Sequence, residues 1–266
     1  MRLPWLMGRL AGRILDRRLL GLIRRCLTAG IMAQGVVMAR HEGTPQGGPL
    51  SPLLANVLLD DIDKELERRG HSFVRYADDS NAYVQSRRAG ERVLAVLRRL
   101  YPTFHLHINE AKSAVARVGD RQFLGFTFWV AAGKVIRRRV ASQALHTMKT
   151  RVRQMTRRTC GRSLAPVCAS LRMYLVGWKA YFQLAETPRV FRLLDSWLRH
   201  RLWPLQLKHG KRGPTIFREL RARGMSVSGA AFVAAHARRW WWNAAQAINI
   251  ALPNALFDGL GLPRLA

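Results

Sequence analysis

Hydrophobic positions follow a helical spacing near both ends of the chain and alternate with polar ones in its middle. Apolar side chains at three- and four-residue intervals predict an amphipathic helix over residues 5–28 and a second from Ser51, the expected N-cap, to Arg69. A short strand over 35–39 precedes the second helix, and alternation over 72–84 predicts a β-hairpin. The later predicted elements are a helix and four strands, at residues 91–100, 104–108, 113–118, 122–130 and 134–138.

Beyond Gly133 the apolar spacing becomes helical again. Three stretches, 145–155, 163–178 and 190–198, show apolar residues three and four apart. Helices beside short antiparallel strands, followed by helices alone, predict an α+β domain over 1–130 and an all-α domain over 131–266. The Trp and Tyr residues of the helical part suit a buried core, with base stacking as the alternative. The same two readings, a buried anchor or base stacking, apply to Trp240, Trp241 and Trp242.

Length and composition are those of a globular protein without a membrane span. The 266 residues are 48% hydrophobic, enough for one large core or two modest ones. No uninterrupted apolar run reaches the ~18 residues that a span needs, and the N-terminal residues do not have the pattern of a signal peptide. We therefore expect a cytoplasmic protein. The three cysteines and eight histidines do not fall at zinc-ligand spacing.

The net charge of the chain indicates a nucleic-acid partner. The chain carries 45 Lys and Arg against 16 Asp and Glu, a net charge of +29. Residues 1–130 hold 20 basic against 12 acidic residues, and residues 131–266 hold 25 against 4. Because such an excess repels itself unless a polyanion neutralises it, we expect nucleic acid to bind the second half. The predicted RNA contacts are Arg151, Arg153, Arg157, Arg158, Lys208, Lys211 and Arg212.

The candidate chemistry lies in Tyr76-Ala77-Asp78-Asp79, at the tip of the predicted hairpin. Adjacent carboxylates repel each other unless a cation lies between them. Mg²⁺ suits this position because it takes carboxylate oxygens together with substrate phosphates. A nucleotidyl-transfer site needs such a pair of carboxylates. Taken alone, the two aspartates also fit an ordinary surface turn, which is the alternative.

Other motifs surround the acidic pair. In the Gly- and Pro-rich loop 43–52, Gln46, Gly47 and Gly48 allow close approach of backbone to a nucleotide. Asn56 is either a capping partner or part of that pocket. Lys112 is either a cation near a triphosphate or a surface lysine in a turn. The loop's string Thr-Pro-Gln-Gly-Gly-Pro-Leu-Ser-Pro is rare, and it is the order of the motifs that makes them informative.

Taken in order, these motifs resemble the reverse transcriptases of group II introns. The resemblance runs through the loop 43–52, the segment 73–79, Asn109–Ser113 and Phe123–Phe126. The later motifs Tyr174-Leu-Val-Gly-Trp178, Tyr181-Phe182 and Leu194-Asp-Ser-Trp-Leu-Arg199 resemble the thumb, or maturase, domain of the same family. The resemblance implies a partial polymerase palm, an antiparallel sheet with helices, followed by the helical thumb/maturase domain.

The resemblance also implies a set of roles. Asp78 is expected to bind the catalytic Mg²⁺ directly and Asp79 to support it. The nucleotide and template pocket would contain Gln46, Gly47, Gly48, Asn56 and Lys112, and the primer grip Leu124 and Gly125. The reaction is RNA-templated DNA synthesis from dNTPs on an RNA/DNA primer-template, together with binding of intron RNA to assist splicing.

One departure from the family pattern limits the expected activity. Relatives carry a first catalytic Asp motif and fingers before the helix that contains Leu6–Leu10, where this chain begins Met1-Arg2-Leu3-Pro4-Trp5. We therefore expect a truncated form with weak or no polymerase activity alone, unless a separate chain supplies the fingers. The alternative is a non-catalytic RNA-binding splicing factor or the remnant of a retroelement.

Overall fold

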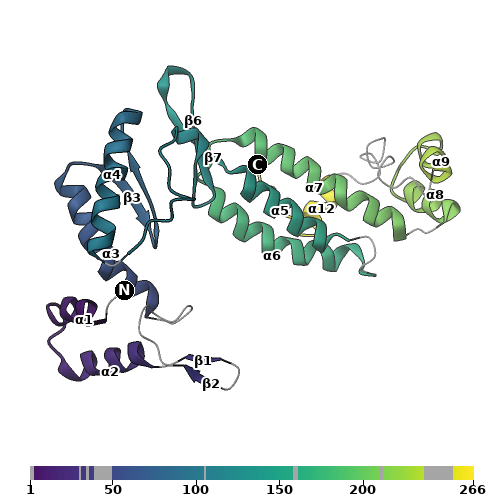
Figure 1. Cartoon of the computed structure of the whole chain (residues 1–266). Coiled ribbons are helices and arrows are strands. Elements are labelled where there is room, and N and C mark those ends of the chain that lie inside the picture. The colour runs from purple at the N-terminus through teal and green to yellow at the C-terminus, as the bar shows by residue number, and fades with distance from the viewer. Residues whose placement is uncertain are drawn as a thin grey trace. The chain divides into compact units, whose positions relative to one another are not determined.

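The chain forms two compact units, Met1–Ala116 (unit 1) and Arg117–Ala266 (unit 2) (Figure 1). The structure is a computed structural model that describes residues 3–29, 31–33, 36–38, 50–104, 106–157, 161–209, 212–236 and 254–266. Helices beside small antiparallel sheets confirm the α+β class. The division into functional regions after residue 130 stays a prediction. Within the described residues, no helix is long and apolar enough to cross a membrane.

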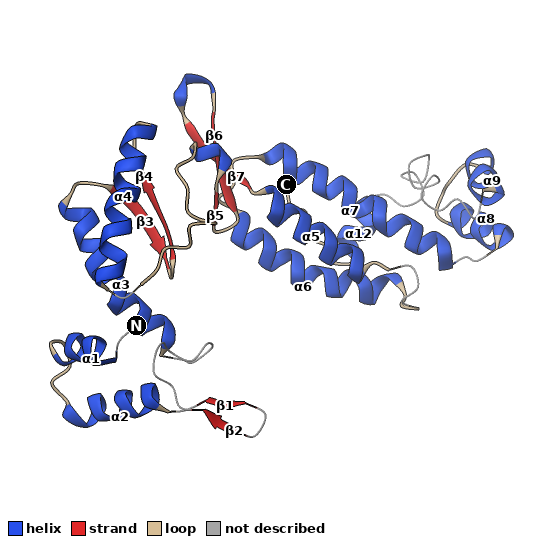
Figure 2. Cartoon of the chain, viewed as in Figure 1, coloured by secondary structure: helices blue, strands red, loops and turns tan. Residues whose placement is uncertain are grey.

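Unit 1 combines helices with two antiparallel strand pairs, β1–β2 and β3–β4. Its elements are α1 (Leu3–Ala11), α2 (Arg17–Thr28), β1 (Ile31–Ala33), β2 (Val36–Met38), α3 (Ser51–Arg68), β3 (Ser72–Tyr76), β4 (Asp79–Tyr83) and α4 (Arg87–Thr103). Figure 2 shows the β3–β4 hairpin beside α3 and α4. Phe73 and Ala82 of the hairpin pack on a buried cluster of Leu59, Ile62, Leu66 and Val93 from the two helices. This packing confirms the predicted hairpin and holds it on a helical base.

The single helix predicted over residues 5–28 is wrong, because the chain turns between α1 and α2. Asp16 ends the turn as the N-cap of α2, and its Oδ1 accepts the N–H of Arg18 at 2.7 Å and of Leu19 at 3.2 Å. Gly12, which has no Cβ, lies at the start of the turn. The turn lets the apolar faces of both helices pack together with α3, in a buried cluster of Leu6, Leu10, Ile23, Leu27 and Leu54.

Two boundaries in unit 1 also differ from the sequence prediction. Helix α3 has Leu50 rather than Ser51 as its N-cap, since the Leu50 carbonyl already accepts the N–H of Leu54 at 3.0 Å. Helix α4 starts before the predicted residue 91 because the Ser86 hydroxyl caps it by accepting the N–H of Ala89 at 3.2 Å. The C-terminal stop of α3 is as predicted, with Gly70 at a φ of 71° just beyond it.

The sheet of unit 2 has three antiparallel strands in the order β5-β6-β7. They are β5 (Gln122–Phe123), β6 (Phe126–Val130) and β7 (Ile136–Val140), with short 3₁₀ turns η1 (Val118–Asp120) and η2 (Ala132–Lys134). The strands predicted at 104–108 and 113–118 are not formed by the described residues of those ranges. Helix α4 continues to Thr103, and the N–H groups of Lys112 and Ser113 bond to the Asn109 carbonyl in a turn.

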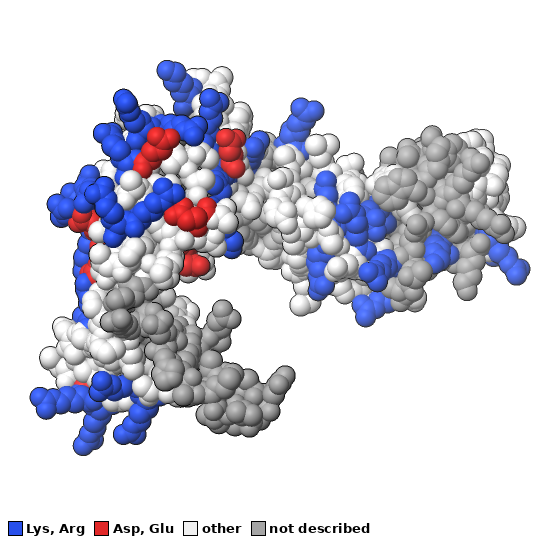
Figure 3. Space-filling model, viewed as in Figure 1, with Lys and Arg blue, Asp and Glu red and all other residues white. Residues whose placement is uncertain are grey.

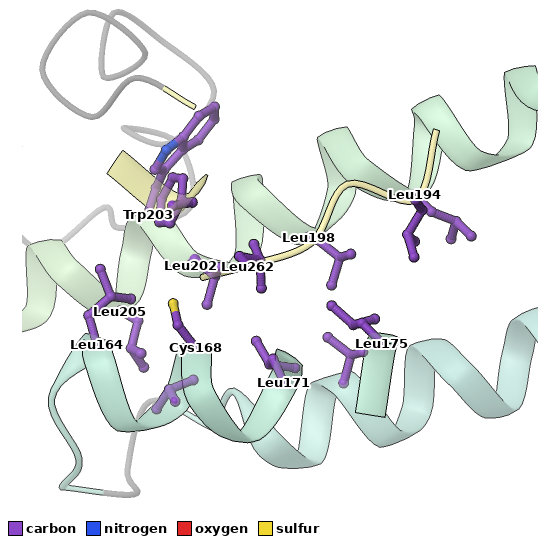
Figure 4. Close-up of a cluster of buried hydrophobic side chains, with 14 of the residues drawn as sticks. Leu164, Cys168, Leu171, Leu175, Leu194, Leu198, Leu202, Trp203, Leu205 and Leu262 are labelled. Atoms are coloured by element: carbon purple, nitrogen blue, oxygen red, sulfur yellow. The ribbon is translucent and has the colours of Figure 1, made fainter. Parts of the chain in front are cut away.

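The helices of unit 2 share one large core. They are α5 (Ser142–Met155), α6 (Leu164–Phe182), α7 (Pro188–His209), α8 (Gly213–Ala222), α9 (Val227–Ala235) and α12 (Asn254–Gly259). Figure 4 shows Leu171 and Leu175 of α6 facing Leu198 and Leu202 of α7, and each of the four is at most 1% exposed. Trp178 is also buried, at 8% exposure, which confirms the core reading for this tryptophan.

A buried polar cluster fixes the C-terminal segment to α7. The Asp195 carboxylate accepts the backbone N–H of Leu265 at 2.9 Å and of Ala266 at 3.0 Å. Arg199, one helical turn later, lies near Asp195 and donates to Asp258 of α12 at 3.3 Å. Because buried charges are costly unless paired, this cluster also specifies where the segment packs.

We predict that Leu171→Ala lowers the free energy of unfolding of unit 2 by about 2–5 kcal/mol, because it opens a cavity in a fully buried site. The control is Met173→Ala on the same helix, where the side chain is 82% exposed and the change should stay within about 0.5 kcal/mol. Urea unfolding followed by tryptophan fluorescence measures both. Seven of the eight tryptophans belong to unit 2. Equal losses in the two variants would contradict the assigned core.

Candidate active site and nucleic-acid interface

The acidic tip is a two-residue turn between β3 and β4. The strands pair as far as Tyr76 and Asp79, which leaves Ala77 and Asp78 as the turn residues. Ala77 has a φ of 55°, whereas Asp78 does not have a positive φ. A positive φ at the first turn residue alone is the pattern of a type II′ turn, which favours glycine there. Alanine in the left-handed region costs about 1–2 kcal/mol, so other contacts must hold this tip in place.

Both carboxylates of the tip are exposed. Several other acidic residues of unit 1 have cationic partners, as in the pairs Asp60–Lys64 at 2.8 Å and Glu110–Arg98 at 2.6 Å. In the part of the chain that the structure describes, no ion pair or side-chain hydrogen bond involves Asp78 or Asp79. Two hard oxygen donors with open access fit a divalent cation that also binds phosphate. The described ranges hold no group of three or more His, Cys, Asp or Glu side chains placed to bind one metal ion.

Arg75 joins this turn to helix α3. Its Nη1 donates to the Ala77 carbonyl at 2.9 Å and to Asn56 Oδ1 at 2.8 Å. Its Nε donates to both carboxylate oxygens of Asp63 at 2.9 Å. The hydrogen bond and charge of Asp63 raise the pKa of the Arg75 guanidinium above its ordinary value. The side chains of Arg75 and Asp63 are only 13% and 21% exposed, so this contact lies largely behind the surface.

The sequence analysis did not single out Arg75 or Asp63, and it did not predict the contact of Asn56 with Arg75. The alternation of β3 places Arg75 on the same inward face as Phe73, which was an available signal. Asn56 and Asp63 are seven residues apart and so share one face of α3. The sequence offered two roles for Asn56, a capping partner or part of the nucleotide pocket. The structure shows another contact, because the side-chain oxygen of Asn56 accepts a hydrogen bond from Arg75.

Lys112 lies in an exposed turn that follows α4. Its N–H donates to the backbone carbonyl of Asn109 at 3.0 Å and to Asn109 Oδ1 at 3.2 Å. Within the same turn, Glu110 pairs with Arg98 of α4, and this hydrogen bond lowers the pKa of Glu110. The three-residue spacing of Asn109 and Lys112 is thus that of a hydrogen-bonded turn, and Lys112 is exposed in this turn.

Leu124 and Gly125 form the two-residue turn between β5 and β6. Their φ values of 51° and 75° are those of a type I′ turn. The Leu124 carbonyl accepts a hydrogen bond from the Tyr181 hydroxyl at 3.1 Å. A Cβ on residue 125 would lie 3.1 Å from the Phe182 ring, so glycine is required by both φ and space. The Tyr181-Phe182 motif at the end of α6 therefore fixes the predicted primer-grip turn.

Gln46, Gly47 and Gly48, the RNA-contact candidates Arg158 and Lys211, and the Trp240–Trp242 run all lie outside the described residues.

The basic surface of unit 2 includes a cluster around Trp197 of α7. Lys149 Nζ and the guanidinium carbons of Arg153 and Arg201 lie 5.8, 5.7 and 5.9 Å from the centre of its ring. We call these four residues the Trp197 cluster. Lys149 and Arg153 form no ion pair within the described ranges, and Arg201 donates to Thr156 Oγ1 at 2.9 Å. Three cations within about 6 Å of the centre of one indole ring make a positive site that suits phosphate.

Four other predicted RNA contacts lie in the described part of unit 2. Arg151 and Arg157 are exposed on and just after α5, Lys208 is half-buried near the end of α7, and Arg212 is exposed before α8. On the face shown in Figure 3, the charged side chains visible over α5–α9 are basic. Sequence reasoning missed Arg201, although its position four residues after Trp197 places both on one helix face.

Two family models match the chain in the order that the motifs suggest. Residues 1–128 match the family described as reverse transcriptase (RNA-dependent DNA polymerase). Residues 145–224 match the group II intron, maturase-specific domain. The first region contains the acidic turn and the predicted primer-grip turn, and the second contains the Trp197 cluster.

Individual relatives match shorter segments. Protein YkfC of Escherichia coli (strain K12) is 41% identical over 64 residues, 24% of this chain and 17% of that protein. The group II intron-encoded protein LtrA of Lactococcus lactis subsp. cremoris is 42% identical over 59 residues, 22% and 10% of the two chains. The retron Mx65 reverse transcriptase of Myxococcus xanthus is 36% identical over 81 residues, 29% and 19% of the two chains.

These matches span less than a fifth of the length of each relative. Reverse transcriptases as a family use a divalent metal ion, which agrees with the exposed carboxylate pair, and both family models imply a nucleic-acid partner. The chain therefore combines a region that matches the reverse transcriptase family with a following region that matches the group II intron maturase-specific domain, the order that its sequence motifs predicted.

Proposed function

We propose that this chain serves RNA-templated DNA synthesis by Mg²⁺-dependent nucleotidyl transfer and that its helical part binds group II intron RNA to assist splicing. The observation that carries the catalytic part is the Asp78–Asp79 turn. Two exposed carboxylates, without a cationic partner among the described residues, lie inside the segment that matches the reverse transcriptase family. Residues 1–130 are the proposed palm and residues 131–266 the proposed thumb/maturase region.

The proposed role of the acidic turn follows from its exposure. Asp78 is the proposed direct ligand of Mg²⁺ and Asp79 the supporting carboxylate. When bound, the ion supplies the positive charge that activates the attacking hydroxyl and neutralises the leaving pyrophosphate. The two carboxylates hold that charge at a tip that a primer end and a triphosphate can reach, because both are exposed.

The remaining roles are proposals with structural support of different kinds. Gln46, Gly47 and Gly48 are assigned to the nucleotide and template pocket from their motif alone. Lys112 is exposed in a fixed turn, as a cation that meets a triphosphate must be. Asn56 keeps its NH₂ group available while its oxygen accepts from Arg75. Leu124 and Gly125 present the backbone of a rigid turn, which suits contact with a primer strand.

The RNA-binding part rests on charge and its placement. The Trp197 cluster concentrates three cations in the maturase-specific region. Arg guanidinium groups bind phosphate and stack on bases, so such a surface suits structured RNA.

A second function from a different class is an RNA-binding splicing factor without polymerase chemistry. The net charge of +21 in residues 131–266 favours it, because RNA binding needs no metal site. The two functions differ in whether Asp78 matters, since splicing assistance alone is independent of it.

We expect Mg²⁺-dependent primer extension by the chain alone to be weak, and we predict that Asp78→Asn abolishes it, because metal charge stabilisation contributes several kcal/mol. RNA affinity should be unchanged. Glu67→Gln is the matched control, since it removes one negative charge from an exposed position of α3.

Three outcomes separate the two functions. Extension by the wild-type chain that Asp78→Asn abolishes supports catalysis. Extension that survives the substitution refutes the acidic turn as the site. A chain that makes no product yet binds structured RNA with a steep salt dependence is the splicing factor instead.

We also predict that Arg153→Gln weakens binding of a structured RNA about tenfold at low salt and reduces the slope of log K against log salt by about 1. Arg87→Gln is the control, because Arg87 in unit 1 is already paired with Glu91 at 3.0 Å. Fluorescence anisotropy with a labelled RNA hairpin at several salt concentrations measures both slopes. An unchanged slope for Arg153→Gln would remove the Trp197 cluster from the RNA interface.

A further inference from the structure

The turn that carries the acidic pair is held from behind by one side chain. All three nitrogens of the Arg75 guanidinium donate hydrogen bonds: Nε and Nη2 to Asp63, and Nη1 to Asn56 and the Ala77 carbonyl. Ala77 is the residue with the strained φ of 55°. Its carbonyl belongs to the peptide that leads into Asp78, so the direction of this peptide and of the next side chain are linked.

The acidic pair has few other restraints. Asp78 and Asp79 are exposed, and no side chain within the described residues bonds to them. Adjacent carboxylates repel each other, and a left-handed alanine relaxes to ordinary dihedrals if nothing opposes it. A contact at the Ala77 carbonyl opposes both tendencies, because it fixes the peptide between the strand and Asp78.

We propose that Arg75 is a positioning residue that fixes this turn against α3 and so orients Asp78 and Asp79 to bind a divalent cation together. The inference rests on the proposed metal-dependent function. Asp63 and Asn56 orient the guanidinium, and the guanidinium orients the turn. Side chains behind metal ligands typically change metal affinity or activity 10- to 100-fold when mutated.

The role needs an arginine. A guanidinium is a rigid fork with donors pointing in several directions, so it reaches Asp63, Asn56 and Ala77 at once. A lysine in this position keeps one positive charge for Asp63, but its single nitrogen cannot also span the carbonyl and the amide oxygen. Arg75→Lys therefore separates positioning of the turn from the charge that stabilises the hairpin on α3.

The test compares Arg75→Lys with Arg98→Lys in the full chain. Arg98 offers the matched control, because its Nε and Nη2 also bind one carboxylate, Glu110, at 2.9 and 2.6 Å within unit 1. Hydrogen–deuterium exchange of peptides covering residues 76–80 reports the turn. Titration with Mn²⁺ followed by electron paramagnetic resonance reports the carboxylates, with Asp78→Asn as the reference without a site.

We expect Arg75→Lys to speed exchange at residues 76–80 about tenfold and to weaken Mn²⁺ binding about tenfold or more. Its thermal unfolding midpoint should stay near that of Arg98→Lys, which should change neither exchange nor Mn²⁺ binding at the turn. The inference is overturned if Arg75→Lys matches Arg98→Lys in both measurements.

Two further outcomes are distinguishable. A wild-type chain that binds Mn²⁺ no better than Asp78→Asn refutes the proposed metal site, while exchange at 76–80 still decides whether Arg75 fixes the turn. If Arg75→Lys does not fold, Asn56→Ala replaces it, since this variant keeps the pair of Arg75 with Asp63. A smaller rise in exchange confined to the turn then supports the inference, and unchanged exchange overturns it.

Discussion

The contact of Arg75 with Asp63 connects helix α3 to the turn that carries the acidic pair. A hairpin tip with two adjacent carboxylates is unfavourable in isolation, because its charges repel and its first turn residue has a positive φ. The conformation of this tip is therefore expected to depend on a contact that fixes its backbone to a neighbouring element. Helix α3 provides this base, since its Leu59, Ile62 and Leu66 are buried in a core cluster of unit 1.

The sequence predicted the parts of the candidate site that depend on neighbouring residues, and it missed the contacts between distant segments. The alternation on both sides of Asp78 was enough to place the acidic pair at a hairpin tip, as the register of Tyr76 with Asp79 confirms. It was not enough for Arg75, whose acceptors lie 12 and 19 residues upstream on α3. A charged residue on an inward-facing strand position is visible in the sequence, but its partner is set by packing between elements.

The fold shows the same division between local and long-range causes. Long helices such as α6 and α7 were predicted in type and approximate position because their periodicity is sustained. The helix predicted over 5–28 failed because its apolar stripe continues through a turn that Asp16 caps. Periodicity cannot show that break, since both halves turn their apolar faces to the same core. The capping residue and Gly12 were the local signals that outweighed it.

Helix α7 shows why net charge alone does not identify an RNA-binding surface. Asp195 and Arg199 of this helix are buried and bind the C-terminal segment. Trp197 lies two residues after Asp195, and Arg201 lies two residues after Arg199. Trp197 and Arg201 both belong to the Trp197 cluster. Residues two apart on a helix point in nearly opposite directions. The same short motif therefore stabilises the fold with one pair and contributes the other pair to the proposed phosphate-binding cluster, and only burial tells the two arginines apart.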